Sequence, residues 1–219
     1  MNTYCFPIHN SAAFRLMLLF SFLLVFFTSK AQTKQKLWTD KDRQVLLVGL
    51  DSTQKNLEKE TSNLTEKQLH FKIDSTQWSV AEILEHLGIY EELLYWDLLN
   101  NQFTPEMPEL AAKVKNVDSI MVAYANDPVK LKAPFVAQPL GRFQRKQELI
   151  DYFNRFRNAV ITLVKETKTD FRLHFIYRSE DAGVWHIRDL QQYTLLWIAH
   201  TERHTNQLRR VKASVNFPK

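Results

Sequence analysis

Apolar residues recur at intervals of three and four positions in four separate stretches of the chain, and this pattern limits the fold more than any other feature. Residues at such intervals lie on one face of an α-helix. The predicted helices cover about residues 39–60, 79–100, 145–167 and 187–212. The chain has only 4 glycines and 7 prolines, which favours long helices over a turn-rich β-structure. We therefore expect an all-α protein folded as an antiparallel four-helix bundle.

Capping residues indicate where two of these helices begin. Thr39 or Asp40 can cap the first helix, because a side-chain oxygen there accepts a hydrogen bond from a free backbone N–H group of the first turn. Ser79 and Glu82 have the spacing of a capping box, which predicts that the second helix begins at this point.

A long, proline-rich connection separates the second and third helices. Five prolines lie within residues 103–141, and proline interrupts helices. We expect this crossover to wrap the outside of the bundle, with a short helix over residues 111–125. Residues 171–177 look extended, like one arm of a hairpin that turns at residues 181–183.

Residues 1–31 have the pattern of an export signal. Arg15 precedes an apolar run over residues 16–27, and small residues follow at the positions that signal peptidases recognise. The run is shorter than the ~20 residues that a membrane span requires, although an uncleaved signal that serves as an anchor is an alternative. We expect an exported, periplasmic or extracellular protein whose mature domain covers residues 32–219 and has no stable membrane span after cleavage.

Charge and cysteine content exclude two classes of function. Residues 1–31 contain Arg15 and Lys30 and no acidic residue, so their removal lowers the net charge from +5 to +3. This charge is too small to indicate nucleic-acid binding. Cys5 lies in the same segment and is the one cysteine of the chain. The mature domain can therefore have neither a disulfide framework nor a cysteine nucleophile.

Two histidines interrupt the buried face predicted for the last helix. Steps of three and four residues trace this face through Leu190, Tyr193, Trp197, His200, His204, Gln207 and Val211. Four residues of helix advance about 6 Å, so imidazoles at positions i and i+4 can bind one metal ion. His86, at the edge of the apolar stripe of the second helix, is the candidate third ligand. Three histidines leave a divalent ion one position for water, whose pKa falls toward about 7.

These histidines also have other interpretations. A pair at this spacing is often a structural pair of polar or core histidines. The residues between His200 and His204 are Thr-Glu-Arg, not the pattern of the His-Glu-x-x-His zinc proteases, so a protease would lack its base. The remaining mature-domain histidines fall in connecting segments, where solvated or hydrogen-bonded side chains are expected: His70, His174 and His186.

Three polar residues are candidates for the surroundings of this site. Glu82 precedes His86 by about one helical turn and could orient it, but its place in the capping box explains it equally well. Arg203 either lies on the helix surface or contacts an anionic substrate. Gln207 shares the histidine face of the last helix and is a further candidate contact.

Five aromatic residues lie at helical spacings on or beside the same two helices. We expect them to pack in the core rather than to form a ligand cage. They are Trp78, Tyr90, Trp96, Tyr193 and Trp197. Tyr90 and Tyr193 have a second interpretation, since a phenol near a metal-bound water can donate a proton.

Two sequence blocks together resemble the DinB-like superfamily, which includes the YfiT-type proteins. The blocks are WSVAEILEHL at residues 78–87 and HTERHTNQL at residues 200–208, and the resemblance extends over about residues 40–213. It implies a four-helix bundle that binds a divalent metal, usually zinc or nickel, and it also implies a homodimer. The ligands implied by the resemblance are His86, His200 and His204.

The resemblance implies several activities. Relatives include S-transferases that use low-molecular-weight thiols, a thiol-dependent maleylpyruvate isomerase and metal-dependent hydrolases. The export signal sets this chain apart, because the thiol-dependent relatives act in the cytoplasm. We expect an envelope enzyme that acts on a small molecule by activating water or an external thiol, with hydrolysis favoured. The alternative is a non-catalytic binding or structural module of the cell envelope with the same fold.

Overall fold

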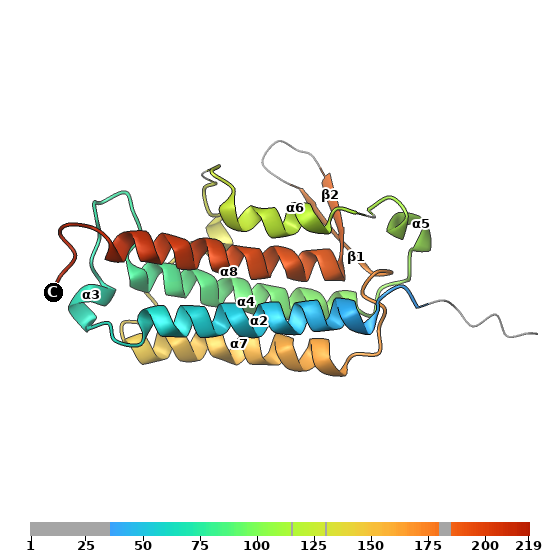
Figure 1. Ribbon diagram of the computed structural model, residues 1–219, viewed down its shortest axis with the longest axis horizontal. Coiled ribbons are helices and arrows are strands. Elements are labelled where there is room, and N and C mark those ends of the chain that lie inside the picture. Colours follow the sequence, from blue (N-terminus) through green and yellow to red (C-terminus); the bar gives the residue numbers. More distant parts are fainter. Residues whose placement is uncertain (1–35, 115, 130, 180–184) are drawn as a thin grey trace, which may run out of the picture. The chain divides into compact units, whose positions relative to one another are not determined.

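The computed structural model describes residues 36–114, 116–129, 131–179 and 185–219. Its four long helices lie side by side as a bundle (Figure 1): α2 (Asp40–Thr61), α4 (Val80–Asn101), α7 (Lys146–Glu166) and α8 (Leu190–Lys212). The shorter elements are α3 (Glu66–Leu69), α5 (Pro108–Ala111), α6 (Asp118–Ala123), the 3-10 turns η1 (Tyr124–Asn126) and η2 (Phe135–Ala137), and the antiparallel strands β1 (Phe175–Ser179) and β2 (Trp185–Asp189). The predicted helical bundle is confirmed, with one two-stranded hairpin as a minor addition. No helix in these ranges is long and apolar enough to cross a membrane.

The export signal predicted for residues 1–31 and the hairpin turn predicted for residues 181–183 both lie outside the described residues.

Each bundle helix packs against two others, in the cyclic order α2, α7, α4 and α8. The expected antiparallel arrangement holds for α2 with α7 and for α4 with α8, whereas α2 with α8 and α4 with α7 run parallel (Figure 1). Contacts between matching ends show the parallel pairs: Lys212 binds Glu60 at the ends of α8 and α2, and Thr167 binds Gln102 just after α7 and α4. The crossover produces this arrangement, because it carries the chain back along the bundle before α7 begins.

Local sequence explains where the helices begin. Thr39 caps α2 and Ser79 caps α4, each within a capping box, which confirms both predicted starts. The predicted start of the last helix at residue 187 is wrong, since α8 begins at residue 190. Asp189 caps this helix, and residues 185–189 pair with β1 instead of continuing the helical pattern.

The crossover follows the outside of the bundle, as predicted, but contains less helix. Helix α6 lies along α8, on the outer side of the bundle (Figure 1). The single helix expected over residues 111–125 is wrong. Helix α5 ends at Ala111, and Asn116 has a φ of 74°, a left-handed conformation that an α-helix does not accommodate. Only α6 and the turn η1 remain of the predicted helix.

A layer of polar side chains divides the bundle core into two apolar clusters. The first cluster includes Leu46, Leu50, Leu94, Leu98, Val160, Val164, Leu190 and Tyr193. The second includes Leu57, Ile83, Leu84, Leu87, Leu149, Phe153, Leu208 and Val211. Between the two clusters, each of the four helices contributes a buried polar residue to this layer: Thr53, Glu91, Arg157 and Thr201.

Arg157 joins the four helices at this layer, although its side chain is fully buried. Its Nε and Nη2 atoms donate to the Glu91 carboxylate at 2.7 and 2.5 Å. Nη1 donates to the Leu50 carbonyl and to Thr53 Oγ1, and Nη2 also donates to Thr201 Oγ1, all at 2.8 Å. All five N–H groups of the guanidinium are therefore used. A buried charge is tolerated only when it is paired and hydrogen-bonded in this way.

One aromatic residue differs from the expected core packing. Trp96 is 48% exposed, although we expected it in the core. The first half of α4 is buried on most sides, but beyond Glu91 only Leu94 and Leu98 are buried. In this second half the helix has one covered face, and Trp96 lies on the other.

Gly88 allows α4 and α7 to approach each other closely. A Cβ atom at this position would lie 2.4 Å from Cδ1 of Tyr152. We expect Gly88→Ala to lower the free energy of unfolding by ~1–3 kcal/mol, the usual cost of overpacking, as measured by urea denaturation.

Gly49→Ala is the matched control, because both glycines lie inside long helices and gain the same helix propensity from alanine. A Cβ atom at Gly49 would lie 2.8 Å from the terminal Cδ1 of Ile198, a half-buried side chain that can rotate away. We expect a smaller loss here. Equal losses in the two variants would contradict the explanation.

Candidate metal centre

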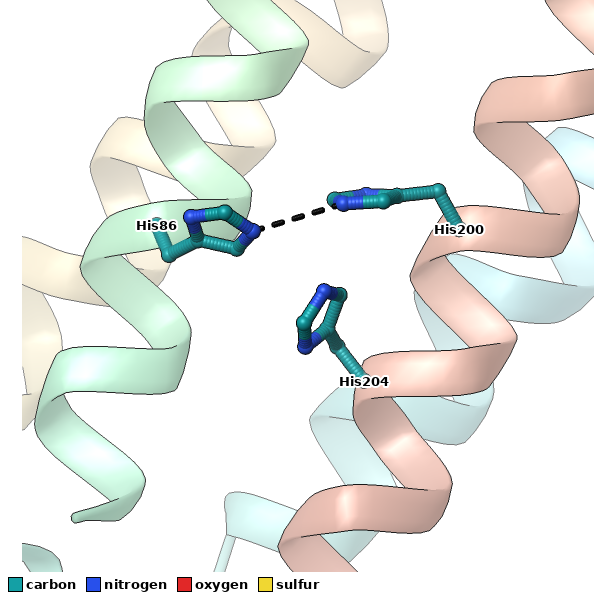
Figure 2. Close-up of side chains that lie close together, drawn as sticks. All are labelled: His86, His200 and His204. Carbon is teal, nitrogen blue, oxygen red and sulfur yellow. Dashed lines mark hydrogen bonds between the residues drawn. The ribbon is translucent and has the colours of Figure 1, made fainter. Parts of the chain in front are cut away.

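Three histidines from two helices meet at one point of the bundle. His86 comes from α4, whereas His200 and His204 come from α8, and the three rings face one another (Figure 2). One ring nitrogen of each lies within 4.8 Å of the others, and the Nε2 atoms of His86 and His200 are 3.3 Å apart. Two nitrogens bound to tetrahedral zinc at about 2.0–2.1 Å stand about 3.3 Å apart. The cluster therefore has the dimensions of a metal site.

The antiparallel packing of α4 and α8 brings these residues together. His86 lies near the start of α4, His200 lies close to the middle of α8 and His204 lies in its second half. The spacing of four residues places His200 and His204 one helical turn apart, with ring centroids at 4.4 Å. The sequence spacing thus accounts for the pair, and the helix packing supplies the third ring.

Hydrogen bonds orient two of the three rings. His86 Nδ1 donates to the carbonyl of Ala137 in η2, and His204 Nδ1 donates to Oε1 of Gln207, both at 2.7 Å. A neutral imidazole carries one proton, so these bonds leave Nε2 of each ring with a lone pair. Histidines that bind metals are commonly oriented by an acceptor on the other ring nitrogen.

Burial keeps the three imidazoles uncharged. Desolvation lowers the pKa of His86 to about 4 and the pKa of His204 to about 3. The pKa of His200 is also far below its usual value, first because of burial and then because of repulsion from the two neighbouring rings. The positive charge of Arg203 lowers the pKa of His200 and His204 further. Neutral imidazole is the form that binds a metal ion.

Aromatic rings surround the histidines. The Tyr90 ring meets His86 and His200 edge to face, with centroids at 4.7 and 4.4 Å. The ring centroid of Trp78 lies 4.7 Å from that of His86, and the ring centroid of Trp197 lies 5.1 Å from that of His200. These large side chains exclude water from part of the site, which strengthens electrostatic interactions there.

Two residues considered from the sequence as neighbours of the metal site, Glu82 and Tyr193, form hydrogen bonds away from the three histidines. Glu82 accepts hydrogen bonds from the backbone N–H of Ser79 at 2.7 Å and from Lys72 Nζ at 2.8 Å, so its carboxylate serves the capping box and an ion pair. Tyr193 lies about two turns before the first histidine of α8, and its hydroxyl donates to Asp97 at 2.5 Å. Neither side chain orients a histidine of the cluster.

Arg203 binds the crossover. Its guanidinium lies 5.0 Å from the ring centroid of Tyr124 and donates to the backbone carbonyls of Tyr124, Asp127 and Val129. Tyr124 in turn lies parallel to the His200 ring, with centroids at 6.3 Å. Arg203 therefore holds this part of the crossover beside the cluster, a role different from both the surface position and the substrate contact considered from the sequence.

The other described histidines do not join the cluster. His174 is buried, and its Nδ1 lies 3.3 Å from the Thr104 hydroxyl. His70 is exposed, and its Nε2 lies 3.0 Å from the Gln144 carbonyl. The side chain of His186 is outside the described part of the chain.

Gln207→Leu tests the orientation of His204, because leucine fills similar space without an acceptor. We expect the affinity for zinc to fall by ~10–100-fold, the usual effect of removing such a partner, in competition with a chelator of known affinity. Gln147→Leu is the control, since Gln147 is exposed on α7 and donates to Asp151. Unchanged affinity in Gln207→Leu, or an equal loss in the control, would contradict the assigned role.

Comparisons with known proteins agree with the helical-bundle fold. A family model described as the DinB superfamily matches residues 50–208. Among solved structures, YfiT from Bacillus subtilis, described as "a probable metal-dependent hydrolase with an unusual four-helix bundle topology", matches with a TM-score of 0.54 and 13% sequence identity. The match covers 83% of this chain and 91% of the YfiT chain, and at this identity it concerns the fold. No curated protein sequence matches at a significant level.

Proposed function

This chain belongs to the DinB superfamily, and on that premise we propose that it is a metal-dependent enzyme whose ion is held by His86, His200 and His204. The observation that carries the proposal is the convergence of three imidazoles whose ring nitrogens lie within 4.8 Å of one another. Imidazole ligands suit zinc and nickel, which are the proposed metals. When bound, such an ion supplies Lewis-acid chemistry and lowers the pKa of a water or thiol that reaches it.

The proposed reaction is hydrolysis, or transfer to a low-molecular-weight thiol, of a small-molecule substrate. The residues of this chain hold the ligands and shape the site. Ala137 and Gln207 orient two of the histidines, and the aromatic rings exclude water. Tyr90, whose ring contacts two of the histidines, is the proposed proton donor.

We place the enzyme outside the cytoplasm, as a periplasmic or extracellular protein. The support for this location is the export-signal pattern of residues 1–31. Hydrolysis is then favoured over thiol transfer, because low-molecular-weight thiols are abundant in the cytoplasm and the proposed location is outside it. A homodimer is also part of the proposal, and light scattering of the purified mature protein tests it.

Metal content is the first test. The mature protein, purified without a histidine tag and reconstituted with zinc, nickel or manganese, is analysed by elemental mass spectrometry beside a variant with alanine at all three histidines. We expect close to one ion per chain in the parent protein and none in the variant. A parent protein that binds no metal would overturn the proposal and favour a binding or structural module.

Access to the ion is the second test. A surface hollow of about 220 Å³ beside the start of α4 is lined by Glu82, Glu85 and Gly141 among others, and none of the three histidines lines it. This hollow therefore does not show whether a substrate reaches the ion. Access is tested with cobalt(II)-substituted protein, because the visible spectrum of the bound cobalt reports the ligands of the ion. Addition of a small thiol or carboxylate should change the spectrum if one coordination position is open. An unchanged spectrum would show a closed structural site and contradict the enzyme proposal.

A further inference from the structure

A buried carboxylate next to His86 binds a turn of the crossover. Glu85 is 2% exposed, and its Oε1 accepts hydrogen bonds from the backbone N–H of Leu140 at 3.1 Å and of Arg142 at 3.3 Å. Its Oε2 accepts from the N–H of Gly141 at 2.9 Å. The Arg142 side chain adds a bond from Nε to Oε1 at 3.0 Å. Four donors from three consecutive residues therefore converge on one carboxylate.

Gly141 makes this convergence possible. Its φ of +70° is a left-handed conformation that glycine adopts without steric cost. A turn of this kind points successive N–H groups toward one point and forms a nest for an anion. In this chain the anion is the side chain of Glu85, which belongs to α4 and not to the crossover.

The same turn is connected to the metal centre by a short, stiff segment. Only Gln138 and Pro139 separate the turn from Ala137, whose carbonyl accepts the hydrogen bond of His86 Nδ1. Proline fixes its own φ and restricts the residue before it. Gln138 is also held, because its Nε2 donates to the Ala133 carbonyl at 3.2 Å.

We propose that Glu85 is a positioning residue for the metal centre, an inference that rests on the proposed function. By holding residues 140–142, Glu85 fixes the Ala137 carbonyl where it sets the tautomer and orientation of His86. The neighbouring positions 85 and 86 of α4 thus have complementary roles, one toward the crossover and one toward the ion. Metal binding and the order of the crossover must then stabilise each other, since linkage between two equilibria is reciprocal.

Glu85→Gln is the test variant, because glutamine keeps the length of the side chain and removes the charge that the nest binds. We expect its affinity for zinc to be ~10-fold lower, at the lower end of effects reported for groups around a metal ligand. Glu82→Gln is the matched control. It removes the same charge one turn earlier on α4, and glutamine still forms a capping box, so zinc affinity should change by less than ~2-fold.

Two further readouts separate positioning from a general loss of stability. In the metal-free protein, ¹⁵N NMR should show His86 protonated at Nδ1 in the parent and in Glu82→Gln, but a mixture of tautomers in Glu85→Gln. Zinc should slow hydrogen exchange at residues 137–142 in the parent protein, and less so in Glu85→Gln. Gly141→Ala, which strains the turn from the crossover side, should act in the same direction as Glu85→Gln.

The outcomes also distinguish this inference from the proposed function. A parent protein that binds no zinc contradicts the proposed function, whereas the tautomer of His86 in metal-free Glu85→Gln still tests the positioning role. Zinc binding by the parent, with the same affinity and the same His86 tautomer in Glu85→Gln, would overturn the inference on Glu85 alone.

Discussion

Arg157→Met is expected to lower the free energy of unfolding by ~3–5 kcal/mol, because it leaves the Glu91 carboxylate buried without its partner. Methionine fills most of the space of the arginine stem but provides none of its five donors. Small domains are stable by only about 5–15 kcal/mol, so the variant should unfold at a much lower urea concentration. Thr53 and Thr201 keep hydrogen bonds to carbonyls of their own helices, so most of the expected loss is assigned to Glu91.

The double variant Arg157→Met/Glu91→Leu separates the cost of an unpaired charge from the value of the pair. Replacing a buried ion pair by apolar residues of similar volume is often neutral or stabilising. We therefore expect the double variant to recover most of the stability lost in Arg157→Met. A double variant as unstable as the single one would show that the guanidinium is needed for its contacts to the other helices.

Signals that act within a few residues explain why the bundle could be predicted. The periodic apolar face and the capping residues Thr39 and Ser79 lie within the segments that they organise, and both helix starts follow from them. The crossover was predictable for the same reason, since prolines disrupt helices locally. The parallel pairing of α4 with α7 was not, because it depends on where the crossover ends.

Interactions between distant segments account for the errors. Ile187 continues the apolar pattern of α8, yet it belongs to β2, where Tyr177 lies opposite it across the hairpin. In the sequence Arg157 looks like one more charge of an amphipathic helix. Nothing near it indicates that it is buried or that Glu91, 66 residues away, is its partner. Neither the start of α8 nor the partner of Arg157 can be predicted from the apolar periodicity of a single segment.

In the metal centre, too, local features could be predicted from the sequence and contacts between distant segments could not. The spacing of His200 and His204 indicates a shared site, because one helical turn determines their separation. Ala137 contributes a backbone carbonyl, which every residue has, so no pattern could indicate it. The sequence drew attention to Glu82 through its capping-box spacing, whereas the structure assigns the contact with the crossover to Glu85.

His204→Ala is expected to abolish stoichiometric metal binding in the reconstituted protein, measured by elemental mass spectrometry. Loss of a group that only hydrogen-bonds a metal ligand lowers zinc affinity by ~10–100-fold. Removal of one of the three ligands themselves should lower the affinity by more than this. His174→Ala is the control, because this histidine is buried but contacts Thr104 and not the cluster. It should lower stability and leave the metal content unchanged.

Thermal unfolding gives an independent check on the same pair of variants. A ligand that binds only the folded state stabilises it by about 2.7 kcal/mol at a free concentration 100 times its Kd. Zinc should therefore raise the Tm of the parent protein and of His174→Ala, but not of His204→Ala at the same concentration. An equal rise in all three would mean that zinc binds elsewhere. A rise absent only from His204→Ala ties the stabilisation to the histidine cluster. Both variants lose an imidazole that is at least partly buried, and only His204→Ala loses a proposed ligand.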